Sequence, residues 1–263
     1  RLLLFDIEHW LIILTFPILQ KEYIQSIHID LFAFIWILPF LLGVSHKLYT
    51  HVLLIFMSVF SKIIGVFFVF PLFLKFYKGI KHKFLLCFYS LFLLISFPAF
   101  YFFVIGVSGN SGFKAFSSSW IWNPGFYSFL NRFLNIGNTE SRYLTIYSFL
   151  FYLFLIGIRS IRCFLIHDYS FTKKDLWSLS YLFFSGFIFF SPVYNSWYVI
   201  WFLVPALLLN LQLGVLYAFF SFTCYTKYLN PSLIPLGEFF GHILFIPSLV
   251  ELYRSNHKDS LEG

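Results

Sequence analysis

The stretch from Pro17 to Asp30 contains side chains that could do acid–base chemistry. Its chemically active members are Lys21, Glu22, Ser26, His28 and Asp30. Glu22, Ser26 and Asp30 follow one another at intervals of four residues, so on a helix they share one face. A carboxylate on such a face can act as a general base, bind a divalent cation or hold a sugar hydroxyl. The alternative is helix capping, with Asp30 near the electropositive N-terminal end of the next helix.

A second group of candidates could bind a sugar through aromatic and amide side chains. Trp120 and Trp122 flank an isoleucine and are followed directly by Asn123. An indole ring can stack on a sugar ring while an amide hydrogen-bonds its hydroxyls. Tryptophan is also the usual residue of a membrane interface, which is the alternative interpretation of Trp120. The connection at 107–142 is about 36 residues long, which is enough to indicate a function.

The third group follows a proline turn at Ser191 and Pro192. Its aromatic and amide members are Tyr194, Asn195, Trp197, Tyr198 and Trp201. Trp197 and Trp201 are four residues apart and share one face of a helix. An aromatic belt at the membrane interface is the alternative, but so dense a cluster exceeds what anchoring needs. We therefore expect its four aromatic residues to bind substrate.

The composition places these three groups in a membrane protein. Of the 263 residues, 60% are hydrophobic and 11% are charged, whereas a soluble domain carries about a quarter charged residues. The net charge of +7 could indicate a nucleic-acid partner, but the basic residues lie in short tracts between apolar segments. That placement is typical of membrane topology, so the lipid bilayer is the expected partner and no nucleic acid is expected.

Apolar runs separated by charged breaks predict an all-α, polytopic bundle of about nine hydrophobic segments. These segments are 7–20, 29–45, 50–74, 84–106, 143–158, 177–193, 197–210, 212–226 and 236–252. Ser61, Lys62 and Gly65 interrupt the third segment near its middle. Because a lysine in hydrocarbon is costly, this segment is expected to be a broken, re-entrant hairpin rather than one full crossing.

The basic residues also predict an orientation. The densest clusters lie at 75–83 and 159–174, and the positive-inside rule places both in the cytoplasm. With the hairpin at 50–74, the stretches 20–30, 107–142 and 191–198 then all open on the extracytoplasmic face. In the last segment we expect Glu238 to be a boundary residue and Glu251 to form an interfacial ion pair with Arg254.

In this order, the three stretches resemble the polyprenyl-phosphate-sugar-dependent glycosyltransferases of the GT-C superfamily, and in particular the bacterial family 87 mannosyltransferases. The resemblance covers about residues 15–252. It is carried by Pro17-Ile18, Lys21-Glu22, Ser26-Ile-His28-Ile-Asp30, Lys62 with Pro71, Trp120-Ile-Trp122-Asn123, Ser191-Pro192, Trp197-Tyr198, Trp201 and Pro205. The first and last elements match most specifically, and the spacing before Pro205 is one residue longer than the family pattern.

The resemblance implies transfer of a hexose, expected to be mannose, from a polyprenyl-phosphate-linked donor to a glycolipid or glycan acceptor. It implies a bacterial inner membrane with the active site on the extracytoplasmic face, and no cofactor. No metal site is assigned, and metal dependence stays open because Glu22 and Asp30 could hold an ion. Catalytic roles would fall to Glu22, His28 and Asp30. Substrate binding would fall to Lys21, Ser26, Lys62, Trp120, Trp122, Asn123, Tyr194, Trp197, Tyr198 and Trp201.

Two further expectations concern the extent of the chain and the competing functions. The chain begins at Arg1 rather than Met, and the family's presumed catalytic aspartate lies in an outer loop upstream of this point. We therefore expect residues 1–263 to be one GT-C-like domain that lacks its first helix and first outer loop, with 107–142 as an extracytoplasmic loop. The alternatives are a transporter or flippase for a lipid-linked sugar, or a non-catalytic assembly subunit. Transporters often repeat a broken helix in each half, and one candidate break is visible here.

Overall fold

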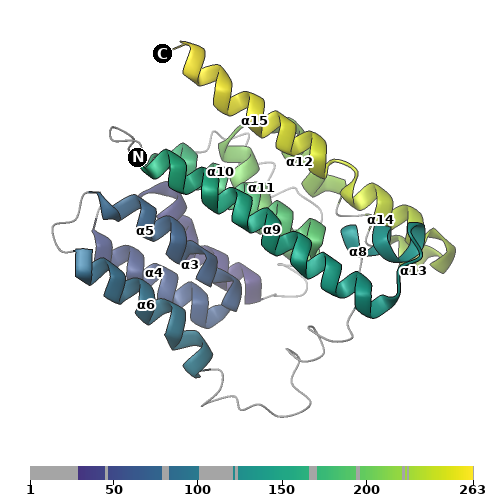
Figure 1. The fold of residues 1–263 in the computed structure, drawn as a ribbon, viewed down its shortest axis with the longest axis horizontal. Coiled ribbons are helices and arrows are strands. Elements are labelled where there is room, and N and C mark those ends of the chain that lie inside the picture. The colour runs from purple at the N-terminus through teal and green to yellow at the C-terminus, as the bar shows by residue number, and fades with distance from the viewer. Residues whose placement is uncertain are drawn as a thin grey trace. The chain divides into compact units, whose positions relative to one another are not determined.

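The structure of this chain is a computed structural model, which describes residues 29–44, 47–78, 83–100, 121, 124–165, 171–193, 196–220, 223 and 225–262. These residues form helices joined by loops, and no β-strand occurs among them (Figure 1). The expected all-α class is confirmed for this part of the chain. Two compact units are present, the first made of 1–26, 116–159 and 177–263, and the second of 27–115 and 160–176.

The second unit is built around a helical hairpin. Its main elements are α3 (Ile29–Leu42), α4 (Leu48–Ser61), the 3₁₀ helix η2 (Ile63–Phe68), α5 (Val69–Tyr77) and α6 (Lys83–Phe100). α4 packs against α3, and α5 packs against α6. The core contains Phe40 and Phe68, which are fully buried and meet edge to face with ring centroids 6.1 Å apart.

The helix breaks where the polar residues predict it. α4 ends at Ser61, and the backbone of Lys62 is extended, with φ −157° and ψ 133°. Gly65 lies so close to α4 that an added Cβ would be 2.6 Å from Ser58 Oγ. A side chain at this position would therefore push η2 away from α4. The interruption expected at 61–65 is present.

The chain reverses direction across this break. His51 lies in the first turn of α4 and Lys75 in the last turn of α5, yet His51 Nε2 and Lys75 Nζ are 3.4 Å apart. In one straight helix, residues 24 apart would be separated by about 36 Å. The segment at 50–74 is therefore a hairpin whose two ends lie together.

The first unit contains the remaining helices (Figure 1). They are α8 (Phe126–Ser128), the π-helical turn η4 (Phe129–Phe133), α9 (Asn138–Leu165), α10 (Lys173–Phe190), the 3₁₀ helix η5 (Ser196–Val199), α11 (Ile200–Leu208), α12 (Gln212–Phe220), α13 (Thr226–Leu229), the 3₁₀ helix η7 (Pro231–Leu233), α14 (Ile234–His242) and α15 (Phe245–Glu262). The end of α9 and the start of α10 belong to the second unit.

The short helix α11 forms the core of the first unit. Every residue from 200 to 207 is buried, because this helix carries apolar side chains on all sides. Asn210 ends it in the left-handed conformation, with φ 54°, and the Leu211 N–H then donates to the Ala206 carbonyl. Asparagine tolerates this conformation, which is common at helix C-termini. The chain can therefore turn sharply into α12.

A carboxylate from α15 caps the start of α12. Glu251 accepts hydrogen bonds from the backbone N–H groups of Gln212 and Leu213, each at 2.9 Å, and of Gly214 at 3.4 Å. These are N–H groups that a helix leaves without an internal partner. The expected role of Glu251 as the partner of Arg254 is therefore replaced by a role in joining two helices.

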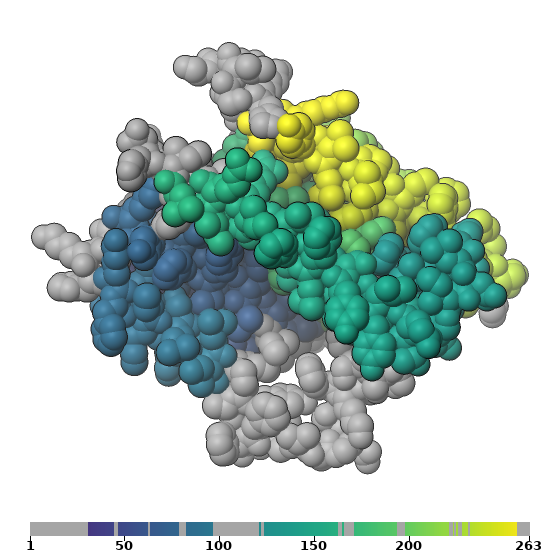
Figure 2. All heavy atoms as spheres, viewed as in Figure 1, coloured from purple at the N-terminus to yellow at the C-terminus, as the bar shows by residue number. Residues whose placement is uncertain are grey.

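Among the described residues, two helical stretches are long and apolar enough to cross a membrane, Asn138–Arg162 and Ile234–Asn256. In the first of these, 11% of the most apolar stretch is buried within the protein. Its outward side chains include Phe151, Phe154 and Ile158, and Figure 2 shows α9 uncovered along one face. An apolar helix with so little protein around it fits a lipid environment better than water. These helices point to membrane association.

Candidate functional site

A cavity of about 650 Å³ opens in the first unit. Its volume is within the range of about 300–1,000 Å³ that is usual for small-molecule sites. Eight phenylalanines line it, and two of them, Phe133 and Phe151, are more than half exposed at its rim. The polar side chains in its wall are Ser128, Arg132, Ser148, Tyr152, Glu238 and His242. The cavity therefore combines a long apolar wall with a small polar group.

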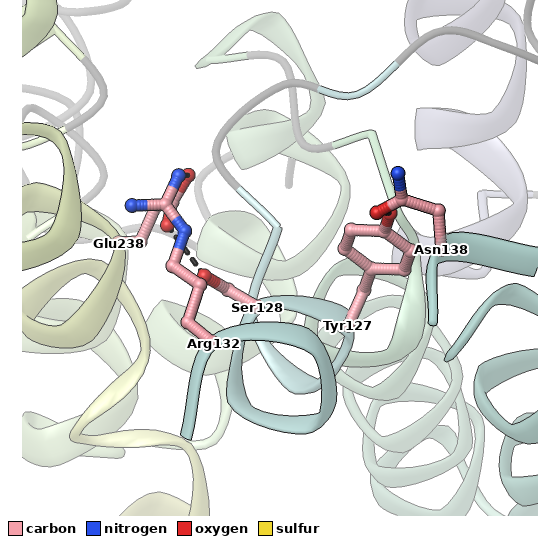
Figure 3. Close-up of polar contacts among 5 residues, drawn as sticks. All are labelled: Tyr127, Ser128, Arg132, Asn138 and Glu238. Atoms are coloured by element: carbon pink, nitrogen blue, oxygen red, sulfur yellow. Dashed lines mark hydrogen bonds and ion pairs between the residues drawn. The ribbon is translucent and has the colours of Figure 1, made fainter. Parts of the chain in front are cut away.

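Glu238 is the centre of this polar group. Its side chain is buried, and its Oε2 accepts a hydrogen bond from Ser128 Oγ at 2.5 Å. Its Oε1 lies 3.2 Å from Arg132 Nη2, in an ion pair whose arginine side chain is 41% exposed. Figure 3 shows the Ser128 and Arg132 side chains converging on this carboxylate. The guanidinium thus links a buried anion to the open side of the cavity.

The chain places these three side chains through helical spacing and one glycine. Ser128 and Arg132 are four residues apart on the α8–η4 turn, so both face α14. Gly125 begins this turn at very close range, because an added Cβ would lie 2.8 Å from the Phe189 carbonyl oxygen and 2.9 Å from His242 Cγ. Only glycine allows the turn to approach α10 and α14 so closely.

His242 lies one helical turn from Glu238 and also faces the cavity. It is buried, and its Nδ1 is 3.2 Å from the Tyr217 hydroxyl. Its ring also meets Phe189 edge to face, with centroids 6.0 Å apart. These contacts hold the imidazole in one orientation beside the polar group.

On the other side of the same turn, Tyr127 ties α8 to the start of α9. Its hydroxyl donates a hydrogen bond to Asn138 Oδ1 at 3.0 Å, as Figure 3 shows. Burial raises the pKa of Tyr127 and outweighs the opposing effect of Arg142 and Arg132. The hydroxyl therefore stays protonated and remains a hydrogen-bond donor at neutral pH.

Most residues that the sequence analysis proposed for the site lie outside the described part of the chain. These are Lys21, Glu22, Ser26, His28, Trp120, Trp122, Asn123 and Tyr194. Asp30 belongs to the first turn of α3 and Trp197 belongs to η5. The structure describes the backbone of these two residues but not their side chains. The proposed roles of these ten residues therefore stay predictions.

Three proposed site residues are described, and they do not line the cavity. Trp201 is 1% exposed and stacks on Phe184, with centroids 5.1 Å apart. Tyr198 is buried and meets Phe187 edge to face. Lys62 belongs to the second unit. For either aromatic ring to stack on a sugar, its core contacts would first have to open.

The sequence analysis missed Glu238, Arg132 and His242. It treated Glu238 as a boundary residue, but the carboxylate is buried and paired. One signal was available, because Glu238 and His242 are four residues apart within an apolar segment and so share a helix face. The partners of Glu238 are Ser128 and Arg132, which are more than 100 residues away in the sequence. No local sequence pattern predicts that contact.

Comparisons with known proteins were made by sequence and by structure. No protein-family model matches the chain, and neither a curated protein nor a solved structure is significantly similar to it.

Proposed function

We propose that the protein is a multi-pass membrane glycosyltransferase that moves a hexose, expected to be mannose, from a polyprenyl-phosphate donor to a glycolipid or glycan acceptor. The observation that carries this proposal is the cavity itself, with its wall of phenylalanines and the polar group at Glu238. A lipid-linked sugar phosphate has the same division into a long apolar chain and a compact charged head. The order of motifs along the sequence supports the same function.

The two parts of the cavity would contribute differently to binding. A polyprenyl chain that leaves the bilayer for an apolar cavity gains little hydrophobic free energy, because lipid tails are equally apolar. Affinity must then come from the head group. Arg132 is suited to a phosphate because its planar guanidinium can donate two parallel hydrogen bonds. Glu238 and Ser128 would act as positioning residues that hold this guanidinium toward the cavity.

The transfer itself needs a base, a bound phosphate and an oriented acceptor. The acceptor hydroxyl oxygen bonds to the anomeric carbon while the bond from that carbon to the phosphate oxygen breaks. The hydroxyl proton passes to a carboxylate, for which Glu22 of the same unit is the candidate. The electron pair of the broken bond stays with the polyprenyl phosphate. Arg132 would stabilise its developing negative charge.

Transfer of labelled mannose from polyprenyl-phosphate mannose tests this proposal in proteoliposomes that contain the full-length protein. We expect the wild type to form a labelled glycolipid. Loss of one preorganised charge-stabilising donor typically costs about 10²–10³ in rate, so Arg132→Gln should lower kcat/KM by this factor. The matched control is Arg142→Gln, since Arg142 belongs to α9, does not line the cavity, and lies 5.9 Å from the centre of the Tyr127 ring.

Two further results separate this function from its alternatives. Glu238→Gln should raise KM or lower kcat, and Glu238→Asp should restore part of the loss because it keeps the charge that orients Arg132. Movement of intact donor between leaflets without formation of a glycolipid would instead identify a flippase. Equal activity of the Arg132→Gln and Arg142→Gln variants would contradict the role assigned to the cavity.

A further inference from the structure

The second unit contains a cluster of basic side chains where the two ends of the hairpin meet. His51 is fully buried between the rings of Phe40 and Phe76, with ring centroids 5.0 and 5.3 Å away. Lys75 Nζ lies 3.4 Å from His51 Nε2 and 5.1 Å from the centre of the Phe40 ring. The ammonium group is therefore held in place by an imidazole and aromatic faces.

A second lysine reaches this cluster over a glycine. Gly43 ends α3 with φ 63°, and an added Cβ there would lie 2.6 Å from Lys173 Cε and 3.3 Å from Lys173 Nζ. Glycine is favoured here by its positive φ, and the end of the Lys173 side chain lies directly over it. Lys173 is exposed, so the cluster is open to solvent on this side.

In the described part of the chain, this cluster has more positive than negative charge around it. Among the described residues, no carboxylate lies within ion-pair distance of Lys75 or Lys173. Asp175 is close to Lys173 in sequence, but it accepts hydrogen bonds from the Thr172 backbone and hydroxyl. The C-terminal end of α3 offers about half a negative charge, which balances only part of two ammonium groups.

We propose that Lys75, Lys173 and His51 form a binding site for a phosphate group. Two ammonium groups can together bind the oxygens of one phosphate, while the buried imidazole of His51 holds the Lys75 ammonium group in place. The phosphate can belong to an anionic lipid head group or be free in solution. Both lysines lie in tracts that the positive-inside rule places in the cytoplasm, where anionic lipids attract basic residues.

The electrostatics of Lys75 would favour an anion beside it. Burial and then the charge of Lys173 lower the pKa of Lys75 to about 8. A phosphate between the two ammonium groups would oppose the second effect and favour the charged amine. The site lies within the second unit and is independent of the cavity at Glu238.

Binding of phosphatidylglycerol to the full-length protein in phosphatidylcholine nanodiscs tests the proposal. We expect the double substitution Lys75→Gln/Lys173→Gln to weaken binding at least tenfold. The matched control is Lys78→Gln/Lys83→Gln, which removes the same charge from two exposed lysines nearby and should change binding less than threefold. Lys75→Arg/Lys173→Arg keeps both charges and should retain binding, which separates loss of the site from loss of the fold.

Competition with inorganic phosphate distinguishes the two sources of the group. Release of phosphatidylglycerol by millimolar phosphate indicates a site for any phosphate, whereas its retention indicates a lipid head-group site. Both outcomes support the proposal if the double glutamine variant has lost binding. Equal binding by the double glutamine variant and its control would overturn it.

Discussion

At the scale of single residues, the polar group of the cavity depends on one buried carboxylate. Glu238 is nearly inaccessible, while its partner Arg132 reaches the surface. Because the guanidinium is partly in solvent, the pair is worth less than a fully buried one. Ser128 adds a second contact to the same carboxylate. The carboxylate therefore holds the Arg132 guanidinium beside the cavity.

The titration of Lys75 is a prediction at the same scale. Its pKa of about 8 means that the amine is half deprotonated near pH 8, well below the usual value for lysine. Because the unfolded chain binds this proton more tightly, stability should rise with pH between about 8 and 10.5. NMR of ¹³C-methylated lysines in the full-length protein should show one resonance with this low pKa.

Three variants test whether the low pKa belongs to Lys75. The low-pKa resonance should disappear in Lys75→Arg and remain in Lys78→Arg. In Lys173→Gln its pKa should rise, since one of the two causes of the shift is removed. A pKa near 10.5 for every lysine in the wild type would show that Lys75 is fully solvated and that the cluster does not form.

At the scale of the elements, the contact between Glu251 and α12 makes the clearest prediction. Three backbone N–H groups share this carboxylate, and α12 is only nine residues long. Glu251→Gln removes the charge that faces the positive end of the helix, at a cost of about 1–2 kcal/mol. Thermal unfolding of the variant in detergent should show a lower midpoint than the wild type.

The control for this prediction is Glu140→Gln, which removes an exposed acidic residue from the first turn of α9. The Glu140 charge interacts with the dipole of α9 through solvent. The loss of folding stability in Glu140→Gln should therefore stay below about 1 kcal/mol. If both variants lost the same stability, the carboxylate of Glu251 would be acting as an ordinary surface charge and not as a cap between helices.

The elements also explain how far the sequence predicts the fold. Eight of the nine expected apolar segments coincide with described helices, and the first lies outside the described residues. Hydropathy places their apolar centres correctly but misjudges their ends. Helix α9 begins at Asn138, whereas the apolar pattern begins at 143, because polar residues occupy its first turn. The break at Lys62 was predictable, since a lysine and a glycine interrupt an apolar run.

The cavity could not be predicted in the same way. Periodicity shows which residues share a face of one helix, such as Glu238 and His242. It does not show which helices meet. The pairing of Glu238 with Ser128 depends on the close approach of Gly125 to α10 and α14, which is a property of the packed unit. Trp201 illustrates the opposite error. Its aromatic cluster predicts a binding surface, but the structure buries its ring in the core.

At the scale of the whole molecule, the apolar surface of α9 and the cavity share residues of the same helix. The uncovered apolar surface of α9 suits a lipid environment. The rim of the cavity includes Phe151 and Leu155 from that same helix. A ligand chain could therefore pass from the bilayer into the cavity along α9 without crossing water. This is the route that a polyprenyl-linked donor requires.

Photo-crosslinking of the donor tests this account most directly. The probe is polyprenyl-phosphate mannose with a diazirine in its first isoprenoid units, bound to the full-length protein in nanodiscs. We predict adducts on residues 126–133 of the turn and 239–246 of α14 and α15, which excess unlabelled donor abolishes and farnesol leaves in place. Adducts confined to residues 31–96, or equal labelling by a probe without phosphate, would contradict the assignment of the cavity as the donor site.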